Sequence, residues 1–263
     1  AKLAHRQRQV LGPDHDDHRA HSMPGQGVVQ LDSAERACLD SVPLLAGMPD
    51  TILRRLAKDP KPLNLERGTF LFHQGSPKTD VYVLLHGWVK LFRMGEAGTE
   101  TIIRIAGAGE VLGDNDLMLR NGHQMCAETI SAVRIFTLDG ERLGVHLRRD
   151  PAMALRLAAS LSAQIQTLTQ HVEEIKLLDA LQRTAHFLLA LCPDQAGACR
   201  VSLPYEKSVI AGWLGMKPAS LSRALARLRR LGVTVDRDTI SITDTRRLAA
   251  LLQLGETSPA SRL

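Results

Sequence analysis

Residues 208–233 read SVIAGWLGMKPASLSRALARLRRLGV, and they contain two helical periods separated by a short turn. Apolar side chains recur at the spacing that packs one helix against another. These side chains are Val209, Ile210, Leu214, Leu221, Leu225 and Leu228. Gly215 suits a tight turn between the helices, and Pro218 suits the first turn of the second helix. The stretch therefore predicts a helix-turn-helix.

The second predicted helix has a basic and polar outer side, because no Asp or Glu occurs between residues 207 and 235. Such a helix fits the major groove of double-stranded DNA, where side chains near its N-terminus meet base edges and flanking cations meet phosphates. The candidate DNA-contacting residues are Lys217, Ala219, Ser220, Ser222, Arg223 and Arg227, with Arg229 and Arg230 beside them. A solvated basic face is the alternative, and the absence of acidic partners argues against it.

The neighbouring segments complete a winged helix-turn-helix. LQRTAHFLLALC at 181–192 has a helical pattern, RVSLPY at 200–205 predicts a short strand, and VTVDRDTISIT at 233–243 predicts two strands around a charged turn. We expect this DNA-binding domain to span residues 179–255, followed by a tail at 256–263.

A long helix is expected before this domain, since a helical period begins after Asp150-Pro151 and holds for about forty residues. Its apolar stripe consists of Leu161, Ile165, Leu168, Val172 and Ile175. A small domain cannot bury so long a stripe, so we expect a dimerisation helix at 150–178 that pairs with the same stripe of an identical chain. The alternative is a helix that lies along its own barrel.

Residues 62–142 consist of short runs rich in Val, Ile, Leu and Phe, separated by glycine turns. This pattern predicts a β-roll or barrel, and two short helices are expected ahead of it from Asp32 onward. We place this sensor domain at 31–149. Strands and helices do not alternate, which argues against a doubly wound dinucleotide fold. The fold class is therefore α+β.

The N-terminal segment 1–30 has few residues to bury, and we expect a mobile tail. Binding of a metal or haem iron by its histidines is the alternative. These histidines are His5, His15, His18 and His21.

Composition limits the partners of the chain. The formal net charge is +5, which permits an anionic partner, while aromatic residues make up only 3% and argue against a stacking platform for single-stranded nucleic acid. The four cysteines form no CxxC motif, and neither a long apolar segment nor a signal peptide is visible, so a cytoplasmic location is expected.

Catalysis is not expected. The chain has no HExxH, Walker lysine or GxGxxG motif, and its carboxylate pairs, Asp114/Asp116 and Glu173/Glu174, lack a predicted His or metal partner. A purely structural module that resembles a cyclic-nucleotide-binding domain is a further alternative, but it leaves the basic C-terminal unit unexplained.

Several motifs together resemble the CRP/FNR family of transcription regulators over roughly residues 40–250. They are LLHGWVKLFR at 84–93, GEVLG at 109–113, LPYEKSVIA at 203–211 and LGMKPASLSRALARLR at 214–229. The last two are most similar to the branch that answers nitrogen oxides in denitrifying bacteria. The resemblance implies a homodimer that binds a pseudo-palindromic operator and recruits or blocks RNA polymerase.

The resemblance also assigns roles in the recognition helix. The family usually carries Glu, Ser and Arg at positions that fall here on Ala219, Ser222 and Arg223. Arg223 then pairs with a guanine, and Ser222 reaches a thymine or a phosphate. Ala219 departs from the pattern, since it cannot accept a hydrogen bond from cytosine, and this leaves the operator sequence open.

The cyclic-nucleotide pocket of the family is only partly matched. Asp114 lies near the position of the glutamate that binds the ribose, but Met125 and Cys126 stand where the family has an Arg-Ser pair for the phosphate. The two hydroxyl positions of the long helix fall on Leu168 and Thr169. Without the arginine the phosphate lacks its charged partner, so cyclic AMP is not the expected effector.

The expected effector is nitric oxide bound through haem, because the nitrogen-oxide-responsive relatives are thought to use haem. An iron-sulphur cluster is excluded, since Cys38 stands alone in the N-terminal region. The predicted apolar wall is Leu117, Met118, Met125, Ile165 and Leu168, with Asp114, Cys126 and Thr169 completing the pocket. The candidate iron ligands are His123, Cys126, His171 and the tail histidines.

Three alternatives remain open: a redox-responsive or ligand-independent regulator, or a cyclic-nucleotide-binding member with an altered pocket. Cys192 and Cys199 flank the loop CPDQAGAC and are a candidate redox pair, although such thiols are usually inert in a reducing compartment.

Overall fold

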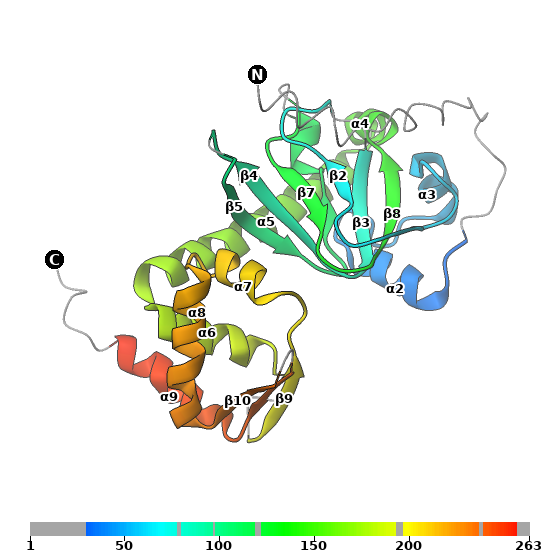
Figure 1. The fold of residues 1–263 in the computed structure, drawn as a ribbon. Coiled ribbons are helices and arrows are strands. Elements are labelled where there is room, and N and C mark those ends of the chain that lie inside the picture. Colours follow the sequence, from blue (N-terminus) through cyan, green and yellow to red (C-terminus); the bar gives the residue numbers. More distant parts are fainter. Residues whose placement is uncertain are drawn as a thin grey trace.

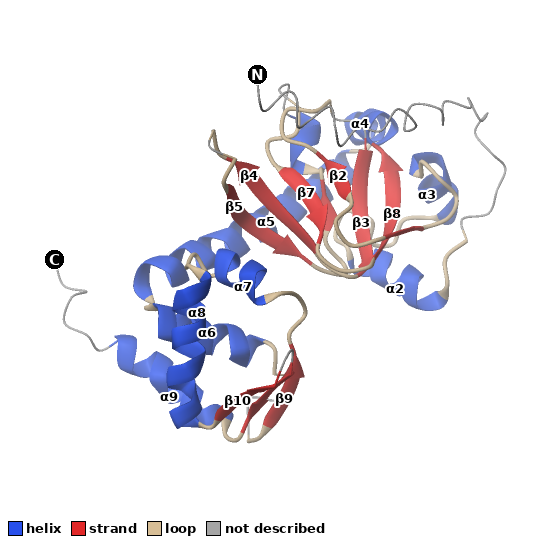
Figure 2. Cartoon of the chain, viewed as in Figure 1, coloured by secondary structure: helices blue, strands red, loops and turns tan. Residues whose placement is uncertain are grey.

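The computed structural model describes residues 30–256 apart from 78–79, 97, 119–121, 193–196 and 237–238. Two units are joined by one long helix (Figure 1). The first unit is dominated by strands and the second by helices (Figure 2). The predicted N-terminal tail with its histidines lies outside the described residues, apart from Gln30.

Two antiparallel four-stranded sheets form the first unit, as the glycine-punctuated strand pattern predicts. One sheet has the order β1 (Leu63–Leu65), β8 (Val133–Asp139), β3 (Asp80–His86), β6 (Val111–Leu112). The other has the order β2 (Phe70–Phe72), β7 (Cys126–Thr129), β4 (Val89–Met94), β5 (Glu100–Ala106).

Helices cover the outer face of the first sheet. The predicted leading helices are present as α2 (Ser33–Ser41) and α3 (Asp50–Leu56). They pack with β3, β8 and the first turns of the long helix in one buried cluster, which includes Leu39, Val83, Phe136, Leu143 and Met153. A second cluster lies between the two sheets, around Leu84, Leu91 and Ile135. The first sheet is thus packed on both of its faces.

The sequence analysis missed two features of the first unit. Helix α4 (Gly140–Arg149) follows β8 directly, where we extended the strand pattern to residue 142. Its N-cap is Asp139, whose carboxylate accepts the N–H of Arg142. A 3-10 turn, η1 (Asn115–Met118), follows β6.

The long helix is α5 (Pro151–Leu177), 27 residues in length. Asp150 caps it by accepting the N–H groups of Ala152 and Met153, and Pro151 occupies its first turn. The helical period of about forty residues is therefore divided between α5 and α6, because Leu178 leaves the helix and Asp179 starts a new capping box with Gln182.

The second unit is a winged helix-turn-helix, which confirms the predicted fold class. It consists of α6 (Ala180–Ala190), β9 (Cys199–Ser202), α7 (Lys207–Trp213), α8 (Pro218–Leu228), η2 (Arg229–Leu231), β10 (Val233–Asp236), β11 (Thr239–Ile242) and α9 (Thr245–Glu256). The wing sheet has the order β10-β11-β9. Helix α9 was not predicted.

Two cysteines of the second unit are joined. Cys192, just after α6, forms a disulfide with Cys199, the first residue of β9, and their Cα atoms are 6.0 Å apart. Cys38 and Cys126 are free thiols. Among the described residues, no helix is both long and apolar enough to cross a membrane.

Two glycines in turns of the roll have a positive φ but differ in the space around them, so their substitution tests what these turns require. Gly87 (φ +88°), between β3 and β4, has the carbonyl oxygen of Ala132 only 2.3 Å from the position of an added Cβ, whereas Gly68 (φ +84°) has open space there. We expect Gly87→Ala to lower the free energy of unfolding by about 3 kcal/mol, from left-handed strain and the clash together.

Gly68→Ala is the matched control, with an expected loss of about 1 kcal/mol from strain alone. Urea denaturation followed by circular dichroism measures both. Equal losses would show that the contact with Ala132 relaxes at no cost.

Candidate functional site

Helix α8 presents the basic face that the sequence predicted. All of its candidate side chains are exposed except Ser220, which is half-buried, while Leu221, Leu225 and Leu228 are buried beneath them. The guanidinium of Arg223 donates to the Ala219 carbonyl and to the Ser220 hydroxyl, both at 3.3 Å. Arg223 thus stays close to the start of α8, beside the end of the helix that enters the groove in proteins of this type.

The neighbouring elements hold α8 at the surface. Gly215 adopts φ +62° in the turn from α7, and the buried face of α8 packs on α6. Ile210 and Leu214 of the α7 segment join the same core as Leu221 and Val233. The recognition helix is therefore fixed by α6, α7 and the wing, and its outer face is free to meet a ligand.

The two units touch along α7. Trp213 at its end stacks on His171 of α5, with ring centroids 3.6 Å apart and planes at 2°. Gly212 lies against Ile102 of β5, where an added Cβ would come within 2.9 Å of the isoleucine side chain. Before α7, Glu206 pairs with Arg67 at 2.6 Å. Helix α7 is thus in contact with both α5 and β5.

His171 is largely buried in this contact. Burial lowers the pKa of its imidazole, and Glu174, whose carboxylate lies 3.8 Å away, offsets only part of the effect. The ring therefore stacks on Trp213 mainly in its neutral form near pH 7.

The long helix has two different faces. Met153, Leu157, Ser160 and His171 are buried on one side, where Met153 and Leu157 pack on the roll and His171 packs on Trp213 of α7. Of the predicted dimer stripe, Leu161 and Leu168 are half-buried, whereas the side chains of Ile165 and Val172 are 63% and 48% exposed. Ile175 is also exposed, at 38%, although its closest side-chain atom is 3.5 Å from the position of a Cβ added at Gly215. The exposed part of the stripe therefore runs from Ile165 to Ile175, with Leu161 and Leu168 half-buried beside it.

A pocket of about 160 Å³ lies between the roll and α5. Its lining comes from the segment after α2, from β5 and β6 with the turn between them, and from one face of α5. The lining residues are Val42, Pro43, Arg104, Gly109, Glu110, Val111, Ser160, Ala163, Gln164 and Thr167. Its volume is close to that of a cavity that accepts one benzene molecule.

A polar network joins the walls of this pocket. Arg104 of β5 donates to the Gln164 side-chain oxygen at 2.7 Å, and Gln164 donates to Asp114 at 3.0 Å. Arg104 is 9% exposed and pairs with the more open Glu110 at 3.1 Å. Burial raises the pKa of Asp114, and the N–H of Asn115 and the charge of Arg104 oppose this shift. Gln164 thus connects α5 to both β5 and the β6 turn.

None of the predicted effector residues lines this pocket. Asp114 is joined to it through Gln164, Leu117 packs against the first core cluster, and Met125 packs against the second. Leu168 is half-buried, and the exposed Thr169 donates to the carbonyl of Ile165 in its own helix. The side chain of Met118 lies outside the described part. These residues lie in different parts of the unit, so the predicted effector site differs from this pocket and stays a prediction.

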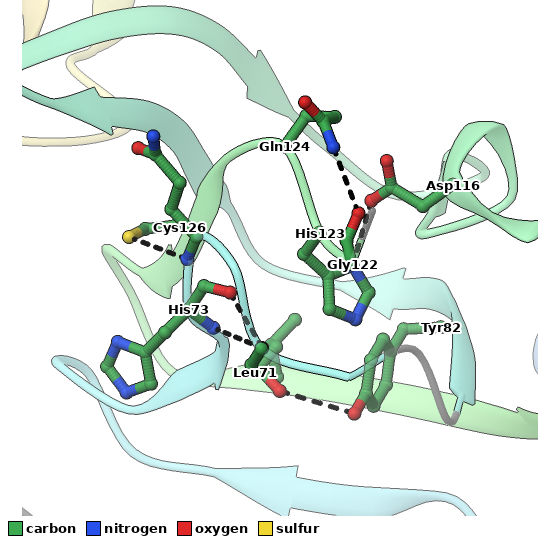
Figure 3. A network of polar contacts seen from close by, with 10 residues as sticks. Leu71, His73, Tyr82, Asp116, Gly122, His123, Gln124 and Cys126 are labelled. Carbon is green, nitrogen blue, oxygen red and sulfur yellow. Dashed lines mark hydrogen bonds and ion pairs between the residues drawn. The ribbon is translucent and has the colours of Figure 1, made fainter. Parts of the chain in front are cut away.

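The candidate iron ligands are engaged elsewhere (Figure 3). The His123 ring is buried, shares its Nδ1 with Asp116 at 2.8 Å, and stacks on Phe72. The Cys126 sulfur accepts the backbone N–H of Gln74 at 3.3 Å. His171 stacks on Trp213, as described above. In the described part of the chain, no cluster of three or more His, Cys, Asp or Glu is placed to hold a metal. Haem iron needs only one axial ligand from the protein, so haem binding through one of these side chains stays a prediction.

The sequence analysis missed Arg104, Gln164 and Glu110. Gln164 was assigned to the polar faces of the long helix, and the strand pattern of β5 hides Arg104, because TIIRIA reads as an ordinary strand with one outward charge. Arg104 within the apolar run TIIRIA was nevertheless a signal of this contact. An arginine in such a run is rarely buried unless a partner satisfies it, so a buried Arg104 implied a polar partner.

Comparison with known proteins identifies both units. The cyclic nucleotide-binding domain family matches residues 62–150, and the Crp-like helix-turn-helix domain family matches residues 182–251. A crystal structure from Ruegeria pomeroyi DSS-3, of a protein provisionally described as cyclic nucleotide binding, is 33% identical with a TM-score of 0.61. The match covers 84% of this chain and 97% of that chain.

Curated relatives are regulators of transcription. A CRP-like cAMP-activated global transcriptional regulator of Mycobacterium tuberculosis is 24% identical over 211 residues, which cover 78% of this chain and 94% of the relative. The global nitrogen regulator of Synechococcus elongatus is 28% identical over 188 residues, which cover 68% and 85%. These findings agree with the expectation that the chain is not an enzyme.

Substitution of two arginines of α8 can separate base contacts from phosphate contacts. A duplex is first selected from a random pool with the wild-type protein. We expect Arg223→Ala to reduce discrimination at one base pair of each half-site by about 1–3 kcal/mol, because it removes a bidentate guanine contact.

Arg227→Ala is the control, and it should weaken binding to all duplexes and lower the salt slope by about one. Fluorescence anisotropy with single-base variants at several salt concentrations measures both effects. Unchanged discrimination by Arg223→Ala would contradict its placement at a base.

Proposed function

The chain belongs to the CRP/FNR family of DNA-binding transcription regulators, and from this premise we propose that it acts as a homodimer whose paired α8 helices bind a pseudo-palindromic operator. The observation that carries the proposal is the combination of an acid-free α8 face with an apolar stripe exposed on α5. Each stripe then covers the other across a two-fold axis.

The exposed part of the stripe supports pairing of helices. Ile165 and Val172 are seven residues apart and lie on one side of α5, with Leu161 and Leu168 beside them. Isolated surface leucines and isoleucines are common, but a heptad-spaced row on one long helix is typical of a coiled-coil seam. In the dimer this row becomes buried.

An effector in the pocket beside α5 explains regulation. Binding there replaces or strengthens contacts of Arg104 and Gln164, which shifts α5 relative to the roll. The shift reaches α7 through His171 and Trp213, and it changes the fraction of dimers whose α8 helices match successive major grooves. Arg104 favours an effector with an anionic group. Cyclic nucleotides stay an alternative, with Arg104 in place of the missing Arg-Ser pair.

Nitric oxide sensing through haem, and membership of the nitrogen-oxide branch, stay predictions from the resemblance. Control of RNA polymerase at a promoter and a cytoplasmic location follow from regulation of transcription, and both belong to the proposal.

Dimerisation is tested at the exposed centre of the stripe. In an isolated chain Asp at position 165 stays in water, but in the dimer it is buried without a partner. We expect Ile165→Asp to give a folded monomer by analytical ultracentrifugation, with operator affinity reduced about a hundredfold or more.

Gln170→Asp is the control, because Gln170 is an exposed residue away from the stripe. This variant should remain dimeric with unchanged operator binding. A dimeric Ile165→Asp protein that binds DNA normally would refute the proposed seam.

Haem binding is tested by spectroscopy. If haem is the cofactor that the resemblance implies, protein mixed with one equivalent of haem should show a Soret band that shifts with nitric oxide, because nitric oxide binds the iron. Loss of this band in His123→Ala would identify His123 as the ligand, and a spectrum without a shifting band would contradict haem sensing.

A further inference from the structure

The disulfide between Cys192 and Cys199 connects two parts of the DNA-binding unit. Cys192 follows the C-terminal end of α6, and Cys199 begins β9, where it lies opposite Ile242 of β11. Cys192 is buried in the same core cluster as Leu225 and Leu228 of α8. The bond therefore fixes the end of the helix that supports α8 to the first residue of the wing sheet.

The segment after β9 extends this connection to the sensor unit. Residues 203–206 run from β9 into α7, and Tyr205 meets the Trp88 ring edge-on at 5.7 Å. Glu206, the next residue, pairs with Arg67 of the roll. A constraint on β9 thus acts on the wing, on α8 and on the contact between the two units.

A disulfide at this position needs an explanation. A regulator of transcription works where DNA is, and in that reducing compartment disulfides are usually transient and serve redox chemistry. The two sulfur atoms differ in access, because Cys192 is buried whereas Cys199 is half-buried. Small thiols and disulfides therefore reach Cys199 first.

We infer that Cys192 and Cys199 are a reversible oxidation site for small-molecule disulfides, and that the oxidised form binds operator DNA more tightly than the reduced form. This inference rests on the proposed operator-binding function and adds to it a second input, independent of the pocket beside α5.

The chemistry balances as a thiol–disulfide exchange. The Cys199 thiolate attacks one sulfur of a small disulfide such as oxidised glutathione, and one small thiol leaves. The Cys192 thiolate then attacks the Cys199 sulfur of the mixed disulfide, and the second small thiol leaves. Two protein thiols are oxidised, one small disulfide is reduced to two thiols, and the excess of reduced glutathione drives the reverse reaction.

The direction of the effect follows from preorganisation. In the oxidised form α6 and β9 are held in the arrangement that supports α8 and the wing, so less order has to be gained when DNA binds. In the reduced form α6 and β9 are no longer joined by the bond, and part of the binding free energy is spent on restoring their arrangement.

The experiment compares one preparation of the full chain in two glutathione buffers, one reduced and one oxidised. Alkylation with iodoacetamide followed by mass spectrometry records whether Cys192 and Cys199 are free. The DNA is a duplex selected from a random pool by the oxidised protein, and its affinity is measured by anisotropy. We expect affinity to fall by at least about threefold on reduction.

Two variants identify the cysteines responsible. Cys192→Ser/Cys199→Ser should bind like the reduced protein in both buffers, and Cys38→Ser/Cys126→Ser should keep the full response. Since wild-type protein is itself compared in both buffers, the test does not depend on the folding of a variant.

The outcomes separate the two proposals. If no duplex is selected, operator binding itself fails. If a duplex is selected but affinity is equal in both buffers, or if oxidised glutathione leaves both thiols free for alkylation, the redox inference is overturned while operator binding stands. Loss of the response in Cys38→Ser/Cys126→Ser would also overturn it.

Discussion

The architecture depends on one rotational constraint in α5. The helix turns by about 100° per residue, so its positions are fixed relative to one another once one face packs on the roll. Met153 and Leu157 define that face, and Ile165 and Val172 then point away from it. The same rigid element thus borders the pocket, reaches α7 through His171 and carries the apolar stripe. A regulator assembled in this way needs no flexible linker to relate its parts.

Contacts along the second half of α5 explain how a small pocket can matter to a distant helix. Gln164 connects α5 to Arg104 and Asp114, while two turns further on His171 lies flat against Trp213. Between these contacts the helix is uninterrupted, and it breaks only at Leu178, where α6 begins in a new direction. The stacked rings of His171 and Trp213 and the tight contact at Gly212 allow few intermediate positions of α7 relative to α5 and β5. This favours switching between discrete arrangements of these elements.

Local sequence patterns predicted most of the fold. Contacts between residues far apart in the sequence could not be predicted from these patterns. The leucines of α8, the proline at its start and the glycine turns of the roll all specify structure within a few residues, and both units formed as expected. Helix α4 was missed because it follows β8 without a breaker and contains Gly140 and Gly144. The pocket beside α5 was not predicted, because Arg104 and Gln164 meet across 60 residues of sequence and no local spacing reports such a meeting.

Ala219 has a consequence beyond the interface itself. The resemblance places Ala219 against a base pair, where a methyl group neither donates nor accepts, so that position of each half-site would be read with little preference. A genome offers millions of competing sequences, and weaker discrimination would increase the number of other sites that bind the protein. Promoter occupancy would then depend more strongly on how many copies of the regulator a cell maintains.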